Sequence, residues 1–131
     1  ERSFMKALRY LIRQWCNDPL LLVLPTCQHP TLQPLVTFIL KNLAEPLTID
    51  DIAGRAHLAS RTVMRLFQRE LGMTFQQYLR TARIIRALDY LARPDTTVTD
   101  TMTACGYSSL SAFSRTFKEM VGVNPSEYRA D

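Results

Sequence analysis

The residues best equipped for chemistry in this sequence are its arginines. Seven of them lie between positions 61 and 93, a stretch in which only Glu70 and Asp89 are acidic. Because Lys and Arg outnumber Asp and Glu by only 16 to 12 over the whole chain, this stretch carries more than the entire net charge of +4. A guanidinium group stays charged and presents a planar fork of N–H donors. The pattern therefore predicts a local basic face that suits an anionic partner.

Other kinds of chemistry lack the residues they need. The cysteines, at 16, 27 and 105, are an odd number without paired spacing. Only His29 and His57 could join them as metal ligands, so neither a disulfide framework nor a zinc site is indicated. The sequence holds no cluster of histidines with carboxylates, no phosphate-cradling glycine loop and no nucleophile beside a base. We therefore expect neither an enzyme nor a cofactor.

Residues 1–30 differ from the rest of the chain. Apolar residues recur at steps of three and four in 1–18, which predicts a helix with one apolar face: Phe4, Leu8, Leu11, Ile12 and Trp15. That face needs a partner, so 1–18 is interpreted as the end of a preceding regulatory or dimerisation region. Repeated prolines then predict a linker over 19–30, followed by the main domain over 31–131.

Nothing in the sequence indicates a membrane. The longest strongly apolar run, Leu20 to Leu24, is far shorter than the roughly 20 residues that a membrane span needs. No signal peptide opens the chain, so a soluble cytoplasmic protein is expected.

From residue 31 onwards the pattern is helical, and no segment alternates apolar and polar residues long enough to predict a strand. The expected class is all-α, with about seven helices besides the N-terminal one. Their predicted ranges are about 32–43, 48–56, 60–71, 74–91, 98–105, 109–120 and 125–129. The apolar residues that indicate the first are Leu32, Leu35, Val36, Ile39, Leu40 and Leu43. Ser60 and Thr74 are expected as N-caps.

Two pairs of these helices have the form of a helix-turn-helix unit, in which two short helices are joined by a tight turn. The first unit covers 48–72 and the second 97–122, and a long helix over 74–92 joins them as a spacer. His57, in the first turn, is interpreted as a residue that tolerates left-handed backbone, and Cys105 as a core residue.

The two units repeat one another at an offset of 50 residues. The aligned pairs are Arg65 with Arg115, Phe67 with Phe117, Gly72 with Gly122, and Tyr78 with Tyr128. The repeat predicts in each unit an exposed arginine, a core phenylalanine, a glycine with positive φ and an anchoring tyrosine. The turn residues His57 and Gly106 differ by 49, so the second unit has one extra residue between its turn and its arginine.

With these residues, the chain resembles the AraC/XylS family of transcription regulators over about 31–129. The segment GYSSLSAFSRTFKEMVGVNPSEYR, at 106–129, is close to the family's signature. The resemblance implies a bacterial DNA-binding domain whose second helices, 60–71 and 109–120, enter successive major-groove segments of double-stranded DNA. It also implies transcription activation as the more frequent role and RNA polymerase as a partner. A homodimer would form through residues 1–18 or a missing N-terminal domain.

Base edges would be read by the exposed side of each second helix near its amino end. The candidates are Arg61, Thr62, Met64 and Arg65 in the first unit, and Leu110, Ser111, Ser114 and Arg115 in the second. Arg61 and Arg65 lead, because arginine can make two hydrogen bonds to guanine O6 and N7. A solvated face or a plain phosphate contact is the alternative for each arginine.

Phosphate contacts are expected from helix amino ends and further basic side chains. The candidates are Thr48, Ser60, Arg69, Arg80, Thr97, Ser109 and Lys118. Each has an alternative role as a cap or a solubilising charge. Arg83 and Arg86 have a different alternative, pairing with Asp89 or Glu70.

The helix over 98–105 departs from the family pattern. The family usually has an apolar residue at the place of Thr101 and a small one at that of Met102. A bulky Met at a close helix contact would tilt the second unit, so base reading by that unit stays open. A protein-interaction module with a basic face is the rival function. The matched arginines favour DNA, and loss of duplex binding with added salt separates the two.

Overall fold

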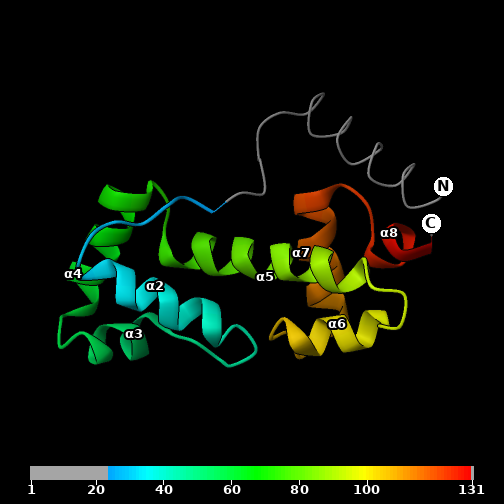
Figure 1. Ribbon diagram of the computed structural model, residues 1–131, viewed down its shortest axis with the longest axis horizontal. Helices are drawn as coiled ribbons and strands as arrows, with labels where there is room; N and C mark the ends of the chain where they lie inside the picture. The colour runs from blue at the N-terminus through cyan, green and yellow to red at the C-terminus, as the bar shows by residue number, and fades with distance from the viewer. Residues whose placement is uncertain (1–23, 131) are drawn as a thin grey trace. The chain divides into compact units, whose positions relative to one another are not determined.

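The computed structural model describes residues 24–130, and over that range every regular element is a helix (Figure 1). The elements are α2 (Leu32–Lys41), α3 (Ile49–Arg55), α4 (Ser60–Leu66), the π-helix η1 (Phe67–Leu71), α5 (Phe75–Leu91), α6 (Val98–Ala104), α7 (Leu110–Val121) and α8 (Pro125–Ala130). The absence of strands from this range confirms the predicted all-α class. The helix expected within 1–18 lies outside the described residues.

Two compact units divide α5 between them. The N-terminal unit comprises residues 24–83, and the described part of the C-terminal unit comprises residues 84–130. The first half of α5 buries Phe75 and Tyr78 in the core of the N-terminal unit, and the second half buries Ile84 and Leu91 in that of the C-terminal unit. The long helix is therefore part of both cores rather than a bare spacer.

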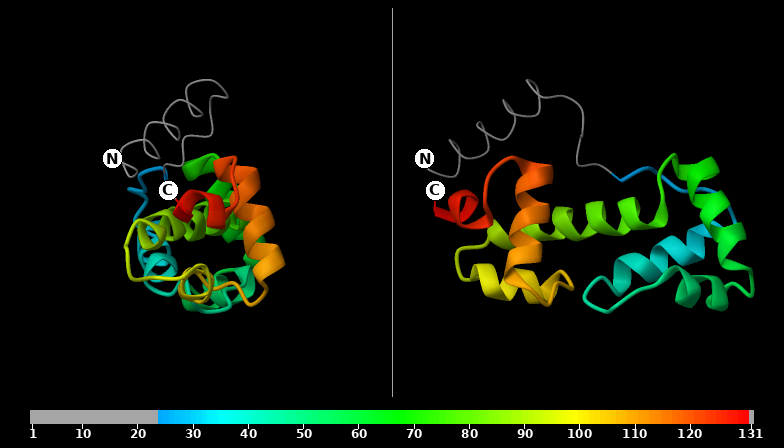
Figure 2. Two further views of the ribbon diagram at one scale, coloured as in Figure 1. Left: turned by 90° about the vertical axis from the view of Figure 1, so that its right-hand side faces the viewer. Right: turned by 180° about the vertical axis from the view of Figure 1, so that it is seen from behind.

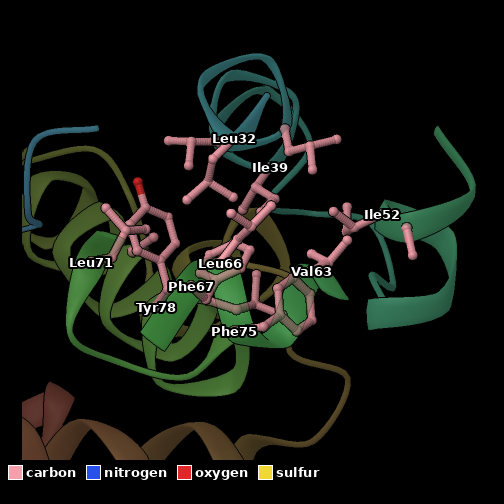
Figure 3. Packing of buried hydrophobic residues seen from close by; sticks show 14 of the residues in the cluster. Leu32, Ile39, Ile52, Val63, Leu66, Phe67, Leu71, Phe75 and Tyr78 are labelled. Carbon is pink, nitrogen blue, oxygen red and sulfur yellow. The ribbon is translucent and has the colours of Figure 1, made fainter. Parts of the chain in front are cut away.

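The core of the N-terminal unit is centred on Phe67 (Figure 3). Its ring meets the rings of Phe75 and Tyr78 edge to face, at centroid distances of 5.7 and 5.8 Å. Leu32 of α2 and Ile52 of α3 are also fully buried in this cluster. Burial of the Phe67 ring fixes which side of α4 and η1 faces inward.

The segment before α2 packs on the same core. Leu24 and Cys27 are partly buried against it. The imidazole Nδ1 of His29 accepts the backbone N–H groups of Thr31 and Leu32, at 3.2 and 3.4 Å, which caps the start of α2. Residues 24–30, within the stretch expected as a linker, thus continue the N-terminal unit.

The C-terminal unit is built by α6, α7, α8 and the end of α5 (Figure 2). It contains a second copy of the aromatic arrangement. Phe117 of α7 is fully buried, and its ring meets Tyr128 of α8 at 5.9 Å, edge to face. The pair Phe67–Tyr78 has the same geometry at 5.8 Å, 50 residues earlier. The structure confirms the predicted repeat of a core phenylalanine and an anchoring tyrosine.

Helix starts and turns explain the change of offset from 49 to 50. Thr48 and Asp51 form a capping box at the start of α3, and Thr97 and Asp100 form one at the start of α6, 49 residues later. The helices after the turns, α4 and α7, begin 50 residues apart. The extra residue of the second unit therefore lies in its turn, between Gly106 and Leu110.

Positive φ angles occur where the sequence predicted them. His57 has φ 56° and Gly106 has φ 85° in the two turns, and Gly72 and Gly122 end their helices with φ 71° and 99°. Cys105 is fully buried, as expected.

Two expectations about local structure are wrong. Ser60 is not the N-cap of α4, because Ala59 holds that position and the Ser60 hydroxyl instead donates to the carboxylate of Asp50. The helix expected over 60–71 is α-helical only to Leu66, and its last five residues form the π-helix.

Thr101, where the family usually has an apolar residue, is fully buried in α6. Its hydroxyl donates to the backbone carbonyl of Thr97 at 2.9 Å, one turn earlier. A buried hydroxyl with a partner carries little penalty, so this departure is accommodated inside the helix.

Gly72→Ala and Gly54→Ala are expected to change stability in opposite directions. A Cβ at either position meets nothing within 4 Å, so sterics with neighbours play no part. At Gly72 the left-handed backbone makes Ala cost about 1–2 kcal/mol of unfolding free energy. In α3, Gly54→Ala should instead stabilise by about 0.5–1 kcal/mol. Urea unfolding followed by circular dichroism measures both, and two changes of the same sign would contradict the backbone argument.

Stability should fall in alkali because of Tyr78. Burial, with a smaller contribution from the nearby Cys27, raises the pKa of Tyr78 from 10.0 to about 12. Below pH 10 the phenol is protonated in both states. Between about pH 10 and 12 only the unfolded chain releases its proton, so stability is lost by up to roughly 2 kcal/mol. Tyr78→Phe should show a shallower loss over this window than the parent chain. Equal slopes would refute the assignment.

Candidate nucleic-acid interface

The basic side chains of residues 24–130 fall into two groups, those held by other groups of the protein and those that are free. Arg129 on α8 is the most extensively held. Its guanidinium donates to the carbonyls of Leu91 at 3.3 Å and Pro94 at 2.7 Å, to the Thr96 hydroxyl at 3.3 Å, and to the carbonyl of Arg93. Arg129 therefore supplies hydrogen-bond donors to the backbone carbonyls at and just after the end of α5.

Arg83 has a similar task in the N-terminal unit. Its guanidinium donates to the carbonyls of Leu43 at 3.2 Å and Glu45 at 2.9 Å, beyond the end of α2. Asp89 and Glu70 were the predicted partners of Arg83. In the structure Asp89 pairs with Arg93 at 2.8 Å, and Glu70 pairs with Arg69. Arg83 thus serves the fold through backbone carbonyls.

Aromatic rings and a neighbouring carboxylate hold further arginines. Arg55 lies 3.7 Å above the Phe38 ring, and Arg86 lies 5.9 Å from that of Tyr90. Arg69 pairs with Glu70 at 3.1 Å, although its side chain is 68% exposed. An exposed pair of this kind contributes little to stability and leaves Arg69 available to a phosphate.

The free group includes the predicted readers. No carboxylate, carbonyl or ring among residues 24–130 pairs with Arg61 or Arg65, and both are exposed on α4. Thr62 is exposed too, and Met64 is 47% exposed. The structure brings all four predicted residues to the outer side of α4, away from the core that contains Phe67.

Arg61, Met64 and Arg65 line one shallow depression together with Gln68 and Arg69. Sequence reasoning missed Gln68. Its spacing, three residues after Arg65 and four after Met64, is the signal that places it on the same side.

The outer side of α7 carries the second predicted set. Leu110 is 50% exposed, Ser111 and Arg115 are exposed, and Ser114 is half-buried. In the described part of the chain Arg115 has no partner, and neither does Lys118 one turn later. The two helices therefore share an exposed, unpaired arginine at the matched position and differ in the residues around it.

The residues predicted at helix starts have local hydrogen bonds. The hydroxyls of Thr48 and Thr97 accept the amides of Asp51 and Asp100 at 3.1 and 2.9 Å, and that of Ser109 accepts the amide of Ala112 at 3.2 Å. Thr48, Thr97 and Ser109 therefore act as N-caps, which was the alternative role given for them. Phosphate contacts by them, by Ser60 and by the exposed Arg80 stay predictions.

Comparison with known proteins decides the family. A family model described as a helix-turn-helix domain matches residues 52–131, more than half of the chain. An AraC-type DNA-binding domain from Chromobacterium violaceum is 34% identical, with a TM-score of 0.71 over 77% of this chain and 90% of its own. The chain belongs to the AraC family of helix-turn-helix proteins.

Other AraC-type relatives extend the comparison. The DNA-binding domain of the global transcriptional factor AdpA, solved in complex with a target DNA, is 30% identical, with a TM-score of 0.74 over 78% of this chain and 92% of its own. The transcriptional activator RhaR of Escherichia coli K12 is 30% identical over 105 residues, 80% of this chain. The chain spans only 37% of the length of RhaR. These relatives are transcription regulators and not enzymes.

Within 24–130, no three His, Cys, Asp or Glu side chains are grouped to hold a metal ion. None of the helices that the structure describes is long and apolar enough to cross a membrane.

The two groups of arginines should respond differently to removal. Arg129→Ala leaves several carbonyls without their donor, so we expect the unfolding free energy to fall by about 2 kcal/mol. Arg65→Ala removes an exposed side chain without partners in the described chain and should change it by less than about 0.5 kcal/mol. Urea unfolding measures both. A large loss for Arg65→Ala would mean that Arg65 serves the fold and not a ligand.

Proposed function

We propose that this chain is a sequence-specific reader of double-stranded DNA, the DNA-binding part of a transcription regulator. The observation that carries the proposal is the matched pair Arg65 and Arg115. Both are exposed and, among residues 24–130, unpaired. They lie on helices whose inner sides are fixed by Phe67 and Phe117. The AdpA domain solved with its target DNA supports the proposal, at 30% identity.

In the first unit, the helix 60–71 lies in the major groove. Arg61 and Arg65 contact guanine O6 and N7 with two hydrogen bonds each, a contact that discriminates by about 1–3 kcal/mol. Met64 packs against a thymine methyl group, the one apolar feature of the major groove, which gives its 47% exposure a purpose. Thr62 lies beside them and contacts base or backbone.

In the second unit, the helix 109–120 enters the next major-groove segment. Arg115 contacts a base or a phosphate, and Leu110 packs on a thymine methyl group or a sugar. Ser111 and Ser114 can hydrogen-bond to more than one base, so they discriminate less than an arginine fork.

Phosphate contacts supply the sequence-independent share of affinity. Arg80 and Lys118 are exposed and, in the described chain, without partners. Arg69 gives up an exposed pair with Glu70, which is worth little. The helix starts at Thr48, Ser60, Thr97 and Ser109 add backbone N–H groups, although Asp51 and Asp100 beside two of them weaken the attraction for phosphate.

The wider regulator is inferred from its relatives. RhaR is a transcriptional activator, so we propose activation for this protein, with RNA polymerase as the further partner. The preceding region, of which residues 1–18 are the end, provides dimerisation.

Selection of bound sites from random duplexes should return two short preferred blocks, about one helical turn or roughly 34 Å apart. Arg65→Ala should relax one block, with about a tenfold loss of discrimination at one position. Fluorescence anisotropy at several salt concentrations measures the affinity of each variant for matched and changed duplexes.

Lys41→Ala is the matched control, because Lys41 is exposed on α2, off the outer side of α4. It should leave both blocks intact. Uniform weakening by Arg65→Ala, with the preference kept, would make Arg65 a phosphate contact. Absence of any sequence preference in the parent chain would overturn the proposed function.

A further inference from the structure

We infer that Gln68 is an additional base-reading residue of the first unit and that the base it recognises is adenine. The inference rests on the proposed function, because it names part of the DNA sequence that the helix 60–71 would select.

The position of Gln68 puts it beside the leading readers. It lines the same depression as Arg61, Met64 and Arg65, and its side chain is exposed. At about 1.5 Å of rise per residue, it lies roughly 4.5 Å along the helix from Arg65, close to the 3.4 Å step between base pairs. A helix seated in the groove by Arg65 would therefore bring Gln68 to a neighbouring base pair.

The backbone of Gln68 is held firmly although its side chain is exposed. The preceding Phe67 is fully buried, and Leu71 is 7% exposed on the same inner side. The amide of Gly72 donates to the carbonyl of Gln68 at 3.0 Å. A side chain on so constrained a main chain is well placed for a hydrogen bond of defined geometry.

The chemistry of the carboxamide selects adenine. Among residues 24–130 no group pairs with the Gln68 side chain, so both its acceptor and its donors are available. Adenine presents the complementary pair in the major groove, a donor at N6 and an acceptor at N7, and glutamine can bind both at once.

The matched position in the second unit sharpens the inference. Lys118 aligns with Gln68 at the offset of 50, and an ammonium group only donates. It cannot accept the N6 donor of adenine. The adenine preference should therefore belong to one block alone, the block that depends on Arg65.

The test replaces one atom of the DNA. Sites selected by the parent chain should hold an adenine next to the base pair whose preference Arg65→Ala relaxes. Substituting 7-deazaadenine there removes the N7 acceptor and keeps the base pair. We expect the affinity of the parent chain to fall about tenfold, and that of Gln68→Ala to be the same on both duplexes. Gln68→Lys should also lose the adenine preference. Gln33→Ala, at an exposed glutamine of α2, should behave as the parent chain does.

The outcomes distinguish this inference from the proposed function. If the parent chain selects a site, Arg65→Ala relaxes it, and Gln68→Ala still loses affinity on 7-deazaadenine, only the inference about Gln68 is overturned. A selected site without adenine beside the Arg65-dependent position overturns it as well. If the parent chain selects no sequence at all, the proposed function fails first.

Discussion

Each unit of this chain depends on one buried aromatic contact, between the phenylalanine of its second helix and a tyrosine of a later helix. Phe67 meets Tyr78 and Phe117 meets Tyr128, at ring distances of 5.8 and 5.9 Å. A helix that buries a phenylalanine at its centre has a fixed inner side, and its opposite side is thereby fixed outward. The exposure of Arg65 and Arg115 follows from this contact, since each stands two residues before its phenylalanine. The ring pair thus decides what each helix can present to a partner.

The packing of the helices also explains why part of the positive charge is not available for binding. The last backbone carbonyls of a helix have no N–H partner within the helix, and this holds at the ends of α2 and α5. Arg83 and Arg129 satisfy them with charge-assisted hydrogen bonds. Once these arginines, and those held by rings or carboxylates, are set aside, the free charge of the described chain lies mainly on the outer sides of the two second helices. From net charge alone, every arginine between 61 and 93 is a candidate for binding. The structure removes those that other groups of the protein hold, such as Arg83 and Arg93.

Features governed by nearby residues could be predicted from the sequence, and features governed by distant ones could not. Caps at Thr48 and Thr97, and the glycines that end η1 and α7, depend on neighbours within one turn, and each pair repeats in the sequence, at an offset of 49 for the caps and 50 for the glycines. Arg83 binds carbonyls about 40 residues away, which no periodicity reveals. Ser60 has the right residue type for a cap, but Asp50, ten residues earlier, takes its hydroxyl. The π-helix could not be predicted, because the apolar pattern of 60–71 matches that of the regular α-helix 110–121. The two segments have equal lengths and bury residues at matched positions. Gln68 lies beyond the amino end of the helix, where base contacts are expected, so the rule for recognition helices does not include it.

The difference between the two units that bears on binding lies in the outer faces of their second helices. Thr101 keeps its buried hydroxyl paired within α6, so this departure from the family pattern leaves no polar group of Thr101 buried without a partner. On the outer face, however, Ser111 stands where the first unit has Arg61, and Ser114 where it has Met64. A hydroxyl can bond to several bases, whereas an arginine fork favours guanine and an exposed thioether favours a thymine methyl group. Only the arginine at 65 and 115 is common to both. Under the proposed function the second unit therefore supplies affinity more than discrimination, and the sequence that the chain selects is set chiefly by the helix that carries Arg61 and Arg65.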